Sequence, residues 1–152
     1  MKILMVCRGN ICRSPMAQGI MEKLIADHQL DWIVDSAATG EWSVGKEPDK
    51  RAIATMAKYG IDITGQRARR IRSTDFEEFD IVYAMDTRNQ EELFKWTLDP
   101  KENEKVRLIL NSLHPGENLS VPDPDWDDDG FETAYTLLRD ACEAIIGNKL
   151  AK

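Results

Sequence analysis

The fold of this chain is decided by residues 6–15, Val6-Cys7-Arg8-Gly9-Asn10-Ile11-Cys12-Arg13-Ser14-Pro15. A short apolar run, Ile3 to Val6, precedes this stretch and an amphipathic run follows it, which predicts a strand, a loop and a helix. Pro15 falls in the first turn of that helix, where its missing N–H costs nothing. The loop reads Cys-x5-Arg-Ser, so its amides can point inward while the helix adds its positive N-terminal end. The sequence therefore predicts a small cup for a tetrahedral dianion.

The side chains of this loop have the chemistry of an anion site. Cys7 is expected at the strand end beneath the cup, where amides and a helix end favour a reactive thiolate. Arg13 offers a planar fork that suits two phosphate oxygens at once. The Ser14 hydroxyl can donate to the thiolate and help it leave later. Gly9 and Asn10 are the residue types that best tolerate the left-handed backbone of a tight cup. A buried structural cysteine with an unrelated arginine is the alternative, which the agreement of strand, loop and helix disfavours.

This stretch resembles the signature loop of the low-molecular-weight protein tyrosine phosphatases, V-C-x-G-N-I-C-R-S-P. The resemblance covers essentially the whole chain and continues through Asp35–Thr39, Trp42–Gly45, Phe79–Asp86 and Asp123-Pro124. It implies that Cys7 is the nucleophile. The other loop residues are then expected to bind the substrate together with Arg13: Arg8, Gly9, Asn10, Ile11, Cys12 and Ser14.

A second functional stretch, residues 121–130, precedes the last expected helix. Cleavage of a phosphate ester leaves an oxyanion that needs a proton, and a carboxyl group beside a dianion can supply one. By resemblance, Asp123 matches the Asp of the family's Asp-Pro motif, which gives this proton and then activates water. The family often has aromatic residues at the next two positions, which here are Asp125 and Trp126. Trp126 thus keeps one aromatic wall for the substrate, while Asp125 adds a rim charge that favours substrates with basic flanks.

Two further segments are expected to support the loop. Trp42 can form one wall of the substrate cleft. By resemblance, Ser36 joins Asn10 in a hydrogen-bond network that holds the loop's shape, whereas a simple turn residue is the alternative. In that family a histidine commonly joins the network, and Gln66 occupies its place here. An amide can still donate and accept hydrogen bonds, so we expect the loop to hold.

Two other motifs in the chain are incomplete. Residues 40–47 nearly spell a nucleotide-binding P-loop, but Glu47 replaces the hydroxyl that would hold Mg²⁺. Residues 125–130 nearly spell a calcium loop, but Thr136 stands where an EF-hand needs Glu, and prolines exclude an entering helix. We therefore expect neither a metal nor a cofactor.

Composition restricts the class of protein further. The 152 residues are most simply one phosphatase domain, 1–152, and the net charge of −7 argues against nucleic acid or anionic membrane as partners. Arg67, Arg69, Arg70 and Arg72 form a basic island, which predicts a solvated face or a docking patch for acidic substrates. Three cysteines do not make a disulfide framework, no run approaches a membrane span, and the N-terminus goes straight into a strand. A cytoplasmic protein is expected.

Apolar periodicity outlines the remaining fold. Strands are expected over Trp32–Val34, Asp80–Met85 and Val106–Leu110, and helices from Pro48, over Thr87–Trp96 and over Phe131–Ile146, with a helical turn at Ser73–Phe76. Alternating strands and helices predict a parallel sheet with helices on both faces. Four strands with the anion loop after the first indicate a three-layer α/β fold of flavodoxin-like strand order 2-1-3-4.

The resemblance as a whole implies a protein-tyrosine phosphatase that works through a cysteinyl-phosphate. Its partners would be phosphotyrosine-containing proteins, with a tyrosine kinase as a further candidate. Cys7 and Cys12 share one tight loop, so a reversible disulfide and sensitivity to oxidants are also expected.

Three alternatives remain beside this reading. A protein-arginine phosphatase is expected to have a threonine-like residue at the position of Ile11, because a hydroxyl suits a guanidinium leaving group. The apolar Ile11 favours a flat phenyl ring instead. An arsenate reductase needs further redox cysteines, and Cys142 lies on the apolar stripe of a helix. A non-catalytic phosphate-binding module would not need Cys7, Arg13 and Asp123 together.

Overall fold

The computed structural model describes residues 1–126 and 129–151, apart from the side chain of Trp126. Four parallel strands form one sheet in the order β2-β1-β3-β4, which confirms the predicted topology. The strands are β1 (Lys2–Cys7), β2 (Ile33–Ala38), β3 (Ile81–Ala84) and β4 (Val106–Leu108). β1 pairs with β2 on one side and with β3 on the other, so the strand order reverses at β1. The loop after Cys7 therefore lies at the topological switch point, where open α/β sheets bind their ligands.

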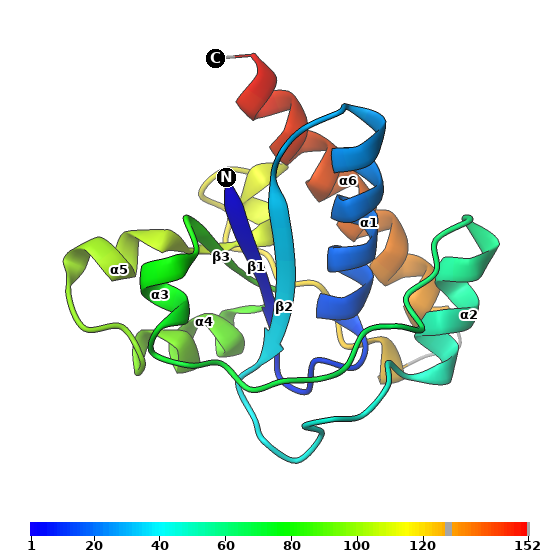
Figure 1. The fold of residues 1–152 in the computed structure, drawn as a ribbon, viewed down its shortest axis with the longest axis horizontal. Helices are drawn as coiled ribbons and strands as arrows, with labels where there is room; N and C mark the ends of the chain where they lie inside the picture. Colours follow the sequence, from blue (N-terminus) through cyan, green and yellow to red (C-terminus); the bar gives the residue numbers. More distant parts are fainter. Residues whose placement is uncertain (127–128, 152) are drawn as a thin grey trace.

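Helices cover both faces of this sheet (Figure 1). They are α1 (Arg13–Asp27), α2 (Lys50–Lys58), α3 (Asp75–Glu78), α4 (Thr87–Phe94), α5 (Pro100–Lys105) and α6 (Gly130–Leu150), with 3-10 turns η1 (Ile109–Ser112) and η2 (Pro124–Trp126). α1 and α6 pack on one face, and α3 and α4 lie on the other. No helix in the described ranges is long and apolar enough to cross a membrane.

The side chains of β1 alternate between two cores. Ile3 and Met5 enter the core beneath α1 and α6, whereas Leu4 and Val6 enter the core beneath α3 and α4. This alternation follows from the two-residue period of a strand, and burial on both faces explains why β1 reads as a continuous apolar run. The end of β1 is therefore held rigidly between two layers.

Several element boundaries differ from the sequence prediction. β2 runs on to Ala38 instead of ending at Val34, because Asp35 to Ala38 pair with Leu4 to Cys7 of β1. α2 begins at Lys50 instead of Pro48, because the Asp49 side chain accepts a hydrogen bond from Arg51 N at 2.8 Å and caps the helix. β4 ends at Leu108, because β3 ends at its register partner Ala84 and offers no further backbone to pair with.

α5 was absent from the prediction. It is short and polar, so it has no apolar stripe to mark it, but Asp99 caps it by accepting from Glu102 N at 2.9 Å. At the other helices only the ends differ: α4 stops at Phe94, and α6 extends to Leu150.

Candidate active site

Cys7 ends β1 and is almost completely buried, with 3% of its surface exposed. Its Sγ lies 3.0 Å from Ser14 Oγ, and Asn10 N donates to the same sulfur at 3.3 Å. Both groups are hydrogen-bond partners that suit a thiolate. Ser14 lies in the first turn of α1, so the sulfur also faces the positive end of a 15-residue helix.

The loop after β1 has its carbonyl groups turned outward. Four of them accept hydrogen bonds from the segment that follows β2: Cys7 O from Thr39 N at 3.0 Å, Arg8 O from Gly40 N at 2.9 Å, Gly9 O from Ser43 Oγ, and Ile11 O from Asp49 N at 2.7 Å. Because the C=O and N–H of a peptide point in opposite directions, outward carbonyls direct the amides that follow them into the cup. The segment after β2 thus shapes an anion-binding loop.

Asn10 is the hub that fixes the loop's conformation. Its backbone is left-handed, with φ of 57°, which asparagine tolerates better than most residues. Its Nδ2 donates to Ser14 Oγ at 2.8 Å and to Ser36 Oγ at 2.9 Å, and its Oδ1 accepts from Arg69 N at 3.1 Å. The Ser36 hydroxyl in turn donates to Gln18 Oε1 at 2.6 Å. With both amide hydrogens of Asn10 engaged, the Ser14 hydroxyl hydrogen is left for Cys7 Sγ.

Gln66 lies beside this network without joining Asn10. Its Nε2 donates to Pro15 O at 3.0 Å, so it fastens the first turn of α1 instead. Its Oε1 is buried, and no described residue donates to it. Gln66 therefore does not take the expected place in the network of Asn10, and the one side-chain hydrogen bond that it makes to a described residue goes to the backbone of α1.

Arg13 is buried and clamped on one edge. Its Nη1 donates to Asp86 Oδ2 at 2.7 Å and to Val121 O at 2.8 Å. Asp86 Oδ1 also caps α4 by accepting from Asn89 N at 2.7 Å, so this carboxylate is itself fixed. Within the described part of the chain, Nε and Nη2 donate to no protein group. The fork of Arg13 is oriented and can serve an anion in the cup.

The cup opens into a cavity of about 160 Å³. Its lining residues come from the loop, from Trp42 and from the acid loop, which we define as residues 121–126: Cys7, Arg8, Gly9, Ile11, Cys12, Arg13, Trp42, Asp123, Pro124 and Asp125. In Figure 1 the segments after β1 and after β2 and the turn η2 meet at this end of the sheet. Asp123 is exposed, and its Oδ1 accepts from Asp125 N at 3.0 Å. The structure therefore brings the predicted nucleophile, arginine and acid into one cavity.

The glycine of the loop has a different role from the predicted one. Gly9 does not have a positive φ. A Cβ at this position would lie 3.1 Å from Trp42 Cζ2, so glycine lets the indole ring rest against the loop. Arg8 covers the same ring, with its guanidinium carbon 5.3 Å from the ring centroid. Trp42 is half exposed and forms a wall, as expected. The side chain of Trp126 lies outside the described residues, as do Asp127 and Asp128.

Cys12 is partly buried beside Cys7. Burial, followed by the negative charge of Asp49, raises the pKa of the Cys12 thiol far above its usual range. Cys12 thus remains a neutral thiol at pH 7, while Cys142 lies fully buried in the core beneath α1 and α6.

Three arginines of the basic island, Arg67, Arg70 and Arg72, are exposed, which agrees with the solvated face that was one of the two interpretations of the sequence. Each arginine of the island pairs with a carboxylate: Arg67 with Glu47, Arg69 with Asp35 and Asp75, Arg70 with Glu41, and Arg72 with Asp75. Asp75 is completely buried and accepts both Nη groups of Arg69 at 3.1 Å. Arg69 therefore braces the segment whose backbone amide holds Asn10.

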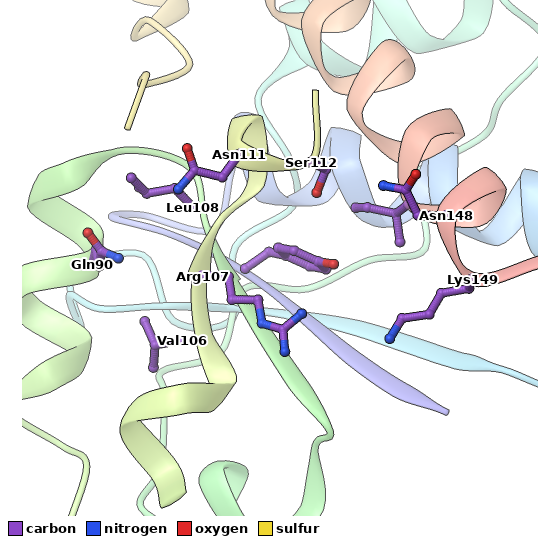
Figure 2. Close-up of a pocket in the computed structure, with 10 residues that line it drawn as sticks. Gln90, Val106, Arg107, Leu108, Asn111, Ser112, Asn148 and Lys149 are labelled. Carbon is purple, nitrogen blue, oxygen red and sulfur yellow. The ribbon is translucent and has the colours of Figure 1, made fainter. Parts of the chain in front are cut away.

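A second cavity, of about 360 Å³, lies at the edge of the sheet against β4 and the end of α6 (Figure 2). Figure 2 shows Arg107 and Lys149 reaching toward this space. Its lining contains neither a thiol nor a carboxylate. It therefore lacks the predicted nucleophile and acid, and we assign the candidate site to the cavity at Cys7, which contains both.

From the sequence, no role at the site was predicted for Asp86, Arg69 or Arg51, whose hydrogen bonds reach Arg13, Asn10 and Asp125. Asp86 follows the carboxyl end of β3, the neighbour of β1, and a carboxylate at that edge of a parallel sheet is the signal that could have found it. Arg69 and Arg51 had no such signal. Their partners Asp75 and Asp125 are known only once the chain is folded.

A buried cysteine in an anion-binding loop, an oriented arginine and a nearby carboxylate are the groups that suit a phosphatase. Comparison with known proteins agrees. The family described as low molecular weight phosphotyrosine protein phosphatase matches residues 2–152, and this chain belongs to that family of phosphoric monoester hydrolases.

Individual relatives cover nearly the whole chain. Low molecular weight phosphotyrosine protein phosphatase 1 of Drosophila melanogaster is 41% identical, over 99% of this chain and 98% of that protein. The crystal structure of a protein tyrosine phosphatase from Entamoeba histolytica, with Hepes in its active site, is 34% identical with a TM-score of 0.91, over 99% of this chain and 97% of that one. That of the drosophila arginine phosphatase is 35% identical with a TM-score of 0.90, over 98% of each chain.

Proposed function

We propose that this protein hydrolyses phosphotyrosine in proteins through a cysteinyl-phosphate intermediate. One observation carries the proposal: the Cys7 sulfur, bound by Ser14 Oγ and Asn10 N, shares a cavity with Arg13 and Asp123. Family membership supports the same reaction. The other loop residues, Arg8, Gly9, Asn10, Ile11, Cys12 and Ser14, would bind the phosphate, with Trp42 and Trp126 beside the phenyl ring and Ser36 in support.

In the first step the Cys7 thiolate attacks phosphorus, and the bond from phosphorus to the tyrosyl oxygen breaks. The inward amides and the free edge of Arg13 stabilise the equatorial oxygens of the transition state. Asp123 gives its proton to the departing phenolate, which is a poor leaving group without one. The phosphoryl group is then on sulfur and Asp123 is ionised.

In the second step water attacks the cysteinyl-phosphate. The Asp123 carboxylate takes a proton from this water and so regains its acid form. The sulfur leaves as a thiolate, which the Ser14 hydroxyl stabilises as a hydrogen-bond donor. Inorganic phosphate is released. The charge of Arg13 and the loop amides supply the positive field for both steps.

The test is turnover of a phosphotyrosine peptide and a phosphoarginine peptide of matched sequence, side by side, in the presence of a metal chelator. We expect rapid release of phosphate from the phosphotyrosine peptide and little from the other. Preferential cleavage of phosphoarginine would overturn the substrate assignment, and dependence on added metal would overturn the mechanism.

A protein-arginine phosphatase is the second candidate. The similarity to the drosophila arginine phosphatase favours it, with 35% identity and a TM-score of 0.90 over 98% of each chain. Ile11 lines the cavity and argues for the aryl substrate, since its apolar side chain suits a flat ring better than a guanidinium group.

Several finer properties belong to the same proposal. Residues 1–152 act as one phosphatase domain, as the family match over residues 2–152 supports. Cys7 is sensitive to oxidants, with Cys12 as its disulfide partner. The protein works in the reducing cytoplasm, because its three cysteines are free and its nucleophile must stay reduced. Its partners are phosphotyrosine proteins and the kinase that makes them; a net charge of −7 disfavours nucleic acid.

A further inference from the structure

Arg51, in the first turn of α2, makes contacts in three directions. Its Nε and Nη2 donate to the two carboxylate oxygens of Asp49, at 3.0 Å each. Its Nη2 also donates to Asp125 Oδ1 at 2.5 Å. Its guanidinium carbon lies 4.8 Å from the centroid of the Phe131 ring. These contacts orient the Arg51 side chain, although 57% of its surface remains exposed.

Both residues whose carboxylates bind Arg51 are also hydrogen-bonded to residues of the active site. Asp49 N donates to Ile11 O at 2.7 Å, so the Asp49 anchor belongs to the wall of the phosphate-binding loop. Asp125 N donates to Asp123 Oδ1 at 3.0 Å, so the Asp125 anchor belongs to the turn that orients the acid. A continuous set of contacts therefore joins Ile11 to Asp123 through Arg51.

The acid loop has a separate attachment on its other side. Val121 N donates to Met85 O at 2.8 Å, and Val121 O accepts from Arg13 Nη1 at 2.8 Å. Asp123 thus lies between an upstream attachment at Val121 and a downstream attachment at Asp125. The upstream attachment is buried, while the downstream ion pair is exposed and shared among three charged groups.

We propose that Arg51 is a positioning residue that fastens the acid loop to the phosphate-binding loop and offsets the charge of Asp125 at the rim. This inference rests on the proposed function, because Arg51 acts through Asp123. It also refines the sequence-based expectation for Asp125. A carboxylate bound to Arg51 at 2.5 Å attracts basic peptides less than an isolated one would, so removal of Arg51 should strengthen the preference for basic flanks.

The test compares Arg51→Gln and Arg51→Lys with the wild-type protein on p-nitrophenyl phosphate and on phosphotyrosine peptides with lysine or with alanine flanks. In Arg51→Gln, kcat on the alanine-flanked peptide should fall about two- to fivefold, as expected for the loss of an exposed ion pair. The nitrophenyl ester should be less affected, because its leaving group needs no proton. The lysine-flanked peptide should gain in kcat/KM relative to the alanine-flanked one, and Arg51→Lys should restore part of both properties.

Arg139→Gln is the matched control. Arg139 lies on α6, pairs with Asp140 at 3.0 Å and covers the Tyr135 ring at 5.8 Å, but it lines no part of the cavity. Its replacement should change neither the ratio of peptide to nitrophenyl ester turnover nor the ratio of kcat/KM between lysine-flanked and alanine-flanked peptides. Equal losses on all three substrates in Arg51→Gln, or ratios like those of the wild type, would overturn the inference.

Amide hydrogen exchange tests the contact between Arg51 and Asp125 independently of enzyme activity. The amide of Asp125 should exchange several-fold faster in Arg51→Gln than in the wild type, and at the wild-type rate in Arg139→Gln. Unchanged exchange in Arg51→Gln would overturn the inference even if the enzyme were active. Absence of wild-type turnover would instead overturn the proposed function, so the two failures can be told apart.

Discussion

Gly130 begins α6 directly beneath the acid loop, and its replacement by alanine should impair the acid step. A Cβ at this position would lie 2.8 Å from both Pro124 C and Pro124 Cα, and closer still to Pro124 O. Real Cβ atoms essentially never approach other atoms within 3.0 Å, and backbone atoms cannot rotate away as a flexible side chain can. Alanine must therefore push the Pro124 peptide outward, by a displacement on the order of 1 Å once the carbonyl oxygen is cleared.

This displacement acts on Asp123, whose carboxylate precedes Pro124. Misplacing a catalytic group by about 1 Å can cost roughly 10²-fold in rate. We therefore expect kcat on a phosphotyrosine peptide to fall by up to about 10²-fold in Gly130→Ala. Turnover of p-nitrophenyl phosphate should fall far less, because its leaving group needs no proton. Overpacking should also cost about 1–3 kcal/mol in the free energy of unfolding, partly offset by the higher helix propensity of alanine.

The assay is steady-state hydrolysis of both substrates together with urea unfolding. Gly147→Ala is the matched control, because Gly147 lies in the same helix with nothing within 4 Å of its would-be Cβ. It should gain about 0.4–1 kcal/mol in stability and leave both rates unchanged. If Gly130→Ala lowers the two rates by the same factor, the contact with Pro124 does not position the acid.

The other predictions concern the residues of the cup. Arg13→Lys should lower kcat by at least about 10²-fold in stopped assays, because a point charge cannot reproduce the planar fork that Asp86 orients, and near-normal turnover would remove Arg13 from the transition state. Ile11→Thr should raise the ratio of phosphoarginine to phosphotyrosine turnover; an unchanged ratio would make Ile11 a packing residue. Peroxide should inactivate the wild type reversibly and Cys12→Ser irreversibly, as measured by recovery in thiol. Because the pKa of Cys12 is raised, disulfide formation should accelerate as pH rises above neutral, and equal recovery of both proteins would leave Cys12 with a packing role.

The strand order and the cup could be predicted because their signals are local. The apolar run before Cys7, the tolerant backbone of Asn10 and the helix that begins at Arg13 are adjacent in the chain, and β1 is buried on both faces. The contact of Ser36 with Asn10 was expected only from resemblance, and it is present at 2.9 Å.

What could not be predicted depends on which charges meet after folding. The island around Arg69 is a run of basic residues in the sequence, yet Arg67, Arg69 and Arg70 pair with carboxylates of distant segments, and Arg72 pairs with the nearby Asp75. Asp125 reads as an exposed acid, yet Arg51 from 74 residues earlier in the chain binds it. From the sequence, Gly9 is expected to provide a left-handed backbone. In the structure, glycine is needed there because the Trp42 ring leaves no room for a side chain.

The chemical identity of the reaction intermediate tests the central claim most directly. Asp123→Asn should retain attack by Cys7 on p-nitrophenyl phosphate but slow the attack of water, so the phosphorylated enzyme should accumulate. Rapid acid quenching followed by peptide mass spectrometry should find one phosphoryl group on the sulfur of Cys7, and none in Cys7→Ser. A phosphoryl group on any other residue, or turnover by Cys7→Ser at a rate near that of the wild type, would contradict the account.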